Sequence, residues 1–80
     1  MRYTRSDLNS LCDRLNKRLR DGGSTMQYLA QSRNGYTAVD LYDGDGCRRA
    51  VGTGSPKECA FYVMEHALTL FTRIDTNHKE

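Results

Sequence analysis

The segment Gly54-Ser55-Pro56-Lys57-Glu58 constrains the fold more than any other part of the chain, because it marks the start of a helix. Ser55, Pro56 and Glu58 fit the N-cap, N1 and N3 positions of a capping box, in which two side chains satisfy backbone amides that the helix leaves free. The residues before it, from Ala50 onward, are expected to form a strand. A strand therefore runs directly into a helix at this point of the chain.

The helix that begins at Pro56 is expected to end at about Thr72 and to supply much of the core. Residues 74–80 lose the helical periodicity, so we expect them to form a frayed polar tail behind a single domain of residues 1–73. The expected inner face of the helix comprises Ala60, Val63, Met64, Ala67, Leu68 and Phe71, flanked by Cys59 and Phe61.

A second amphipathic helix is expected near the start of the chain, over about Arg5 to Arg20. Apolar residues recur there at three- and four-residue steps, which places them on one helix face. Thr4 and Asp7 form a capping signature before the helix, and the glycines after Asp21 favour the backbone conformation that ends many helices. The apolar face comprises Leu8, Leu11, Cys12, Leu15 and Leu19.

Between the two helices, the pair Asn34-Gly35 is a strong signal for a two-residue hairpin turn. Counting outward from this turn pairs Ala30 with Val39 and Tyr28 with Leu41, so that these four residues share one apolar face. The opposite face is mixed in character, as expected for a sheet that is covered on one side.

The second turn, within Asp43-Gly44-Asp45-Gly46, allows either a two-residue or a longer loop. The two-residue loop places Leu41 opposite Ala50 on the core face. A longer loop could bring Arg48 to the core face, which the cost of burying an unpaired charge disfavours. We therefore expect the short loop.

Together these elements predict an α+β domain of order α-β-β-β-α, with a three-stranded antiparallel meander and two helices packed on one face. The 80 residues suffice for one domain with one modest core and, by default, no deep catalytic cleft. The chain has no apolar run of about 20 residues and no signal-peptide core, so we expect a cytoplasmic protein without a membrane partner.

The reactive side chains are not arranged in a way that predicts catalysis. The three cysteines contain no C-x-x-C pair, which argues against a disulfide scaffold or a zinc knuckle. No serine or cysteine is paired with a histidine and a carboxylate in a recognisable pattern. We therefore expect a protein that is not an enzyme and that uses no metal, cofactor or small-molecule substrate.

The order of elements resembles the double-stranded-RNA-binding domain over almost the whole chain. Leu8-Asn9-Ser10-Leu11 is similar to the first-helix motif of that family, and Tyr28 matches a tyrosine of its first strand. Gly54-Ser55-Pro56-Lys57-Glu58-Cys59 looks like the family's entry into the second helix, where Lys57 matches one of the phosphate-binding lysines. Ala67-Leu68 matches a small-then-leucine pair late in that helix. The chain also looks like small uncharacterised proteins of phages and mobile elements with the same element order.

One functional hypothesis is a non-enzymatic interaction module that pairs with itself or with a protein partner. The contact surface would be the sheet face that the helices leave open, because exposed apolar and aromatic patches often mark interfaces. The side chains expected on this face are Leu29, Tyr36, Ala38, Tyr42, Arg49 and Val51.

The alternative hypothesis is a nucleic-acid-binding domain for duplex RNA or a single strand. The formal net charge is only +2, but residues 1–20 hold six basic and two acidic side chains, an excess of four positive charges. Two tyrosines of the open face, Tyr36 and Tyr42, could stack with Arg49 on unpaired bases. The basic side chains expected to follow phosphates are Arg14, Lys17, Arg18, Arg33 and Lys57.

Overall fold

The computed structural model describes the backbone of residues 2–78 and the side chains of residues 2–73. It confirms the predicted α+β fold, whose elements in chain order are α1 (Arg5–Asp21), β1 (Gln27–Arg33), β2 (Tyr36–Tyr42), β3 (Arg48–Gly54) and α2 (Pro56–His78).

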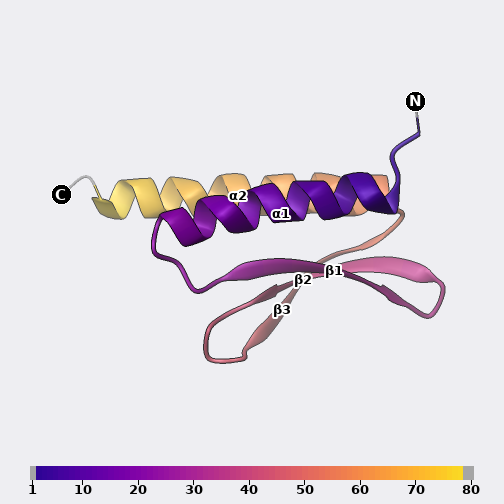
Figure 1. Cartoon of the computed structure of the whole chain (residues 1–80), viewed down its shortest axis with the longest axis horizontal. Coiled ribbons are helices and arrows are strands. Elements are labelled where there is room, and N and C mark those ends of the chain that lie inside the picture. Colours follow the sequence, from indigo (N-terminus) through magenta and orange to yellow (C-terminus); the bar gives the residue numbers. More distant parts are fainter. Residues whose placement is uncertain (1, 79–80) are drawn as a thin grey trace.

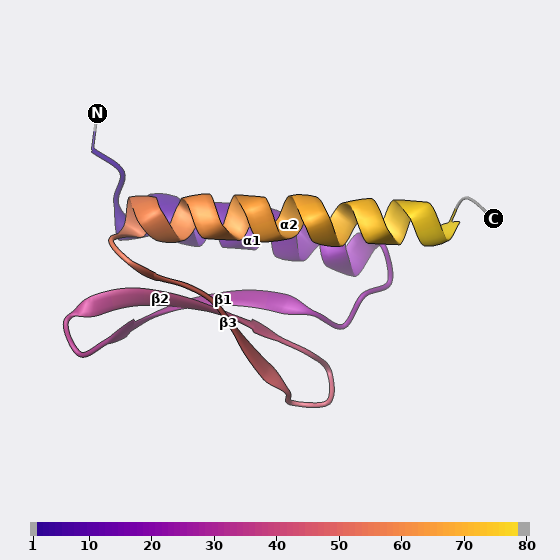
Figure 2. The same cartoon turned by 180° about the vertical axis from the view of Figure 1, so that it is seen from behind.

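The three strands form one antiparallel sheet in the order β1-β2-β3, and both helices lie on the same face of it (Figure 1). The helices run side by side in the same direction, with α1 packed over β1 and α2 over β3. The view from behind shows that no helix covers the opposite face of the sheet (Figure 2). The layer arrangement is therefore the predicted one.

Both helices begin at the capping boxes that the sequence predicts. The backbone N–H of Asp7 donates to the Thr4 hydroxyl, and the N–H of Thr4 donates to the Asp7 carboxylate. Ser55 and Glu58 make the same exchange at the start of α2. The helix α2 continues past residue 72, its predicted end, to residue 78, and residues 79 and 80 of the predicted tail lie outside the described part.

The first hairpin has the predicted register throughout. Ala30 pairs with Val39, and Tyr28 pairs with Leu41. The turn residue Asn34 has a φ of 51° and Gly35 a φ of 86°, as a two-residue turn of this kind requires. The prediction that Asn34-Gly35 sets the register is confirmed.

The second hairpin has the longer of the two possible loops, so the prediction of a two-residue loop is wrong. The N–H of Asp43 donates to the carbonyl of Cys47, and the N–H of Gly46 donates to the carbonyl of Asp43. Gly46 has a φ of 86°, the left-handed conformation that closes a three-residue loop. In consequence Leu41 pairs with Arg49 instead of Ala50.

A β-bulge reconciles this longer loop with the rest of the hairpin. Val39 still pairs with Gly52 as predicted, but the next pair is Asp40 with Ala50, so that Val51 is the extra residue. Val51 packs against the hydrophobic core, and its predicted place on the open face is therefore wrong. Bulges increase strand twist, and the β2–β3 loop diverges from the helix layer in both views (Figures 1 and 2).

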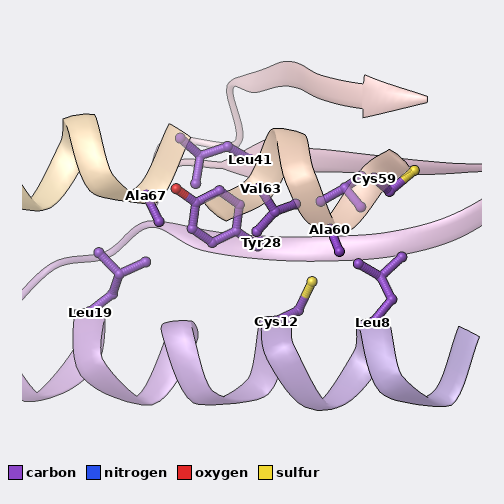
Figure 3. Close-up of a cluster of buried hydrophobic side chains, with 10 residues drawn as sticks. Leu8, Cys12, Leu19, Tyr28, Leu41, Cys59, Ala60, Val63 and Ala67 are labelled. Carbon is purple, nitrogen blue, oxygen red and sulfur yellow. The ribbon is translucent and has the colours of Figure 1, made fainter. Parts of the chain in front are cut away.

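The hydrophobic core lies between the sheet and the two helices. Figure 3 shows Leu8, Cys12 and Leu19 of α1 pointing toward Tyr28 and the buried face of α2. Each fully buried side chain of leucine or valine size contributes about 1.5–3 kcal/mol to stability. The buried core residues are Leu8, Cys12, Leu19, Tyr28, Val39, Leu41, Cys59, Ala60, Val63 and Ala67.

The buried face of α2 is narrower than predicted. Ala60, Val63 and Ala67 are buried, as expected. Met64 and Leu68 are 58% and 71% exposed, so their predicted place in the core is wrong. Because α1 covers one side of α2 and the sheet covers another, the side that carries Met64 and Leu68 has no neighbour among the described elements.

Candidate interaction surfaces and a basic cleft

The open sheet face offers less apolar surface than the sequence predicts. Leu29 and Tyr36 are exposed as expected, and Tyr42 is half-buried. Ala38 lies on this face by its pairing with Gln31 but is only 1% exposed, so it provides no contact area.

A buried ion pair occupies the middle of this face. Asp40, which is 1% exposed, accepts hydrogen bonds from Arg33 at 2.7 Å and from Gln31 at 2.8 Å. A carboxylate loses free energy on burial unless other donors replace its water, and here a guanidinium and an amide do so. Arg33, expected to follow phosphates, is thus engaged within the chain.

Arg49 lies on the opposite side of the sheet from the predicted one. Its cross-strand partner Leu41 is a core residue, and side chains of directly paired residues share a face. Arg49 therefore points toward the helix layer. The three-residue loop is the physical cause, because it shifts the end of β3 by one position and so exchanges the two faces there.

A cleft of about 500 Å³ opens on that side, between the end of the β2–β3 hairpin and the second half of α2. The described residues that line it include three arginines, Arg48 and Arg49 of β3 and Arg73 of α2, and one carboxylate, that of Asp43. Figure 2 shows the hairpin diverging from α2 in this region. The cleft is thus strongly basic.

His66 connects this cleft to the core. Its Nδ1 lies 2.8 Å from the hydroxyl oxygen of Tyr28, and the two rings meet edge to face with centroids 5.7 Å apart. Burial raises the pKa of Tyr28 to about 12. Burial also lowers the pKa of His66, and the charges of Arg49 and Arg73 lower it further. We assign the phenol as donor to Nδ1, which leaves the ring proton of the neutral His66 on Nε2.

Three large apolar side chains form an exposed stripe on α2, here named the outer stripe. Phe61, Met64 and Leu68 are 65%, 58% and 71% exposed, and their spacing places them on one helix face. A single exposed apolar residue is ordinary, but three neighbours form a contiguous apolar patch, and such patches often mark an interface. The outer stripe is a candidate contact surface.

The outer stripe has a basic margin on the side of α1. The Arg18 guanidinium lies 4.4 Å from the ring centroid of Phe71, which shows that this flank of α2 faces α1. Arg14 of α1 and Lys57 of α2 line a common hollow, to which Arg2 and the carboxylate of Asp7 also belong. The basic margin comprises Arg14, Arg18 and Lys57.

The opposite flank of the stripe is acidic. Successive helix residues turn by about 100°, which places Glu58 and Glu65 on the flank of Phe61 away from Phe71. Both glutamates are exposed. They form the acidic margin of the outer stripe.

The predicted phosphate-binding set is only partly brought together. Arg14 and Lys57 share one hollow, and Arg18 lies further along α1, over Phe71. Lys17 is exposed on α1. Arg33 is paired with Asp40 on the open sheet face, away from the helices.

Sequence reasoning missed both the outer stripe and the basic cleft. A signal for the stripe exists, because apolar residues at positions 60, 61, 63, 64, 67 and 68 span a wider arc than one buried helix face. The cleft depends on the loop length and on the bulge, for which the sequence carries no comparable signal.

The part of the chain that the structure describes has neither a metal-binding cluster nor a membrane-spanning helix. It contains no group of three or more histidine, cysteine, aspartate or glutamate side chains placed to hold a metal ion. None of its helices combines the length and the apolar content needed to cross a bilayer. Cys12 and Cys59 are buried and Cys47 is exposed, all as free thiols.

Comparison of the chain with protein-family models, with curated proteins and with solved structures finds no match.

Proposed function

We propose that the protein is a small, non-enzymatic interaction module in which two copies pair through the outer stripe of α2. The observation that carries this proposal is the exposure of Phe61, Met64 and Leu68 on the longest helix of the chain. Burying side chains of this size contributes about 1.5–3 kcal/mol each. The open sheet face is the weaker candidate surface, because its centre is occupied by the Arg33–Asp40 ion pair.

A second copy of the chain fits the outer stripe better than an uncharged partner does, because the two margins of the stripe carry opposite charges. Contact around a two-fold axis requires a surface that complements itself. If the axis runs parallel to α2, each stripe residue stacks on its counterpart, and the acidic margin of one copy meets the basic margin of the other. An antiparallel arrangement would instead place like charges together, which disfavours it.

Sedimentation velocity at micromolar concentration tests this pairing. We expect the wild type to form a dimer and Leu68→Ser to remain a monomer with unchanged circular dichroism, since the side chain is exposed in the monomer. Leu29→Ser is the matched control, because it removes an exposed leucine from the open sheet face. A monomeric wild type, or a Leu68→Ser variant that still dimerises, would contradict the proposal.

The hollow lined by Arg2, Arg14 and Lys57 holds three basic side chains beside the one carboxylate of Asp7 among the described residues, and this excess favours a second candidate function, the binding of nucleic acid. The resemblance to the double-stranded-RNA-binding domain places Lys57 among the phosphate contacts. This function predicts that a labelled duplex or single strand binds at low salt, that affinity falls steeply with salt, and that Lys57→Gln weakens it. Absence of binding at low salt would exclude this candidate.

A further inference from the structure

The basic cleft between the β2–β3 hairpin and α2 holds positive charge that the described residues do not neutralise. Arg48, Arg49 and Arg73 line it together with one carboxylate, that of Asp43. Arg48 pairs with Tyr42, so its side chain leaves the strand on the open face, whereas Arg49 and Arg73 face His66 in the cleft. Within the described residues the guanidinium groups of Arg49 and Arg73 have no hydrogen-bond or ion-pair partner. Because guanidinium groups bind carboxylates and phosphates in paired hydrogen bonds, this concentration of charge favours an anion.

The cleft also has an apolar wall. Met26, Leu41 and Leu70 line it beside the arginines. Its volume of about 500 Å³ lies within the range of small-ligand sites, which combine apolar walls with a few convergent polar groups. A bare inorganic anion would leave this wall in contact with water.

The hydrogen bond to Tyr28 fixes the position of His66, which is one of the residues that line the cleft. Tyr28 is fully buried in the core, so the imidazole that it contacts is held at one orientation. With Nδ1 engaged by the phenol, Nε2 remains as a neutral donor. Such a donor adds a directional hydrogen bond to the charges of the arginines.

We propose that this cleft binds a small organic anion, with its carboxylate or phosphate group between the arginines and its apolar or aromatic body against Met26, Leu41 and Leu70. The site is separate from the outer stripe, because it lies on the flank of α2 that faces β3. Binding therefore does not depend on self-pairing.

Nuclear magnetic resonance titration with four probes tests the proposal on the ¹⁵N-labelled chain. Phenyl phosphate and phenylacetate each combine an anionic group with an aromatic ring. Inorganic phosphate has the anionic group alone, and benzyl alcohol has the ring without a charge. We expect the first two to shift amides of β3 and of the second half of α2 and to bind more tightly than the last two. Equal affinity for phenyl phosphate and inorganic phosphate, or an absence of shifts around the cleft, would overturn the proposal.

A double variant separates specific binding from general attraction to a basic protein. Arg49→Gln with Arg73→Gln should weaken phenyl phosphate binding by about tenfold or more, because charged hydrogen bonds are lost. The control Arg20→Gln removes an exposed arginine of α1 outside the cleft and should leave the affinity unchanged. If Arg20→Gln weakened phenyl phosphate binding as much as the double variant does, specific binding in the cleft would be contradicted.

Cys47 gives an independent readout, because it is the exposed cysteine and it lines the cleft, whereas Cys12 and Cys59 are buried. Phenyl phosphate should slow the alkylation of Cys47 by iodoacetamide in the wild type and not in the double arginine variant. An unchanged rate in the wild type would count against occupation of the cleft.

Discussion

Among the described residues, Arg33 and Gln31 donate to the buried carboxylate of Asp40 on the open sheet face, and this makes the ion pair sensitive to substitution. Removing one partner of a buried pair leaves a carboxylate without water and without its counter-charge. The Arg33 side chain is about one-third exposed, at 32%, so solvent screens part of the interaction.

We therefore expect Arg33→Ala to lower the free energy of unfolding by about 2 kcal/mol. Urea denaturation followed by circular dichroism measures this change. Arg20→Ala, which removes an exposed arginine, should change it by no more than about 0.5 kcal/mol. Similar small effects for both variants would show that Asp40 does not depend on its partner.

His66 makes the stability of the fold depend on pH near neutrality. The groups that face it are Tyr28 of β1, Arg49 of β3 and Arg73 of α2, and burial with the two arginines lowers its pKa in the folded chain. The unfolded chain then binds a proton at higher pH than the folded chain. The contribution of neutral His66 to the free energy of unfolding is therefore fully present above the ordinary histidine pKa of about 6.5. It declines as the pH falls through that value.

The corresponding prediction is a lower urea midpoint at a pH of about 5.5 than at about 7.5, with a smaller difference in His66→Gln. Denaturation curves at the two pH values measure it. An equal difference in the wild type and the variant would assign the pH dependence to other groups.

At the scale of elements, β3 and α2 approach each other closely at Gly52. A Cβ atom placed there would lie 2.6 Å from the Tyr62 Cβ, closer than real contacts allow. We expect Gly52→Ala to destabilise the fold by about 1–3 kcal/mol, because Tyr62 must move.

A double-mutant cycle measured by urea denaturation tests this contact. Gly52→Ala in the background of Tyr62→Gly should cost clearly less than in the wild type, because the Tyr62 Cβ and ring atoms that the new methyl group would meet are gone. Additive effects of the two substitutions would mean that Gly52 is required for another reason, such as its backbone conformation.

The same elements show where the sequence was sufficient for prediction and where it was not. Asn34-Gly35 fits one turn type, so the first hairpin and its register followed from local chemistry. Two aspartate–glycine pairs in succession fit two loop lengths, and the bulge at Val51 depends on packing against the core. Helical periodicity identifies an apolar face but does not show which part of that face the neighbouring helix covers. For this reason the sequence predicted Leu68 in the core.

At the scale of the whole molecule, the two candidate sites lie on different flanks of α2. The outer stripe is on the side that neither α1 nor the sheet covers, and the basic cleft is on the side toward β3. The cleft exists because the longer loop turned Arg49 toward the helices and the hairpin diverges from α2. One amphipathic helix thus supplies part of the core and contributes to two separate surfaces.

The self-pairing of this molecule is tested most directly by mixing two charge-reversed variants and measuring association by sedimentation equilibrium. Glu65→Lys and Arg14→Glu should each associate more weakly than the wild type, because each opposes like charges across the parallel two-fold contact. Their mixture should restore association, since both contacts of the mixed pair join opposite charges. Singly reversed variants that associate as tightly as the wild type, or a mixture that stays monomeric, would contradict pairing through the outer stripe and its charged margins.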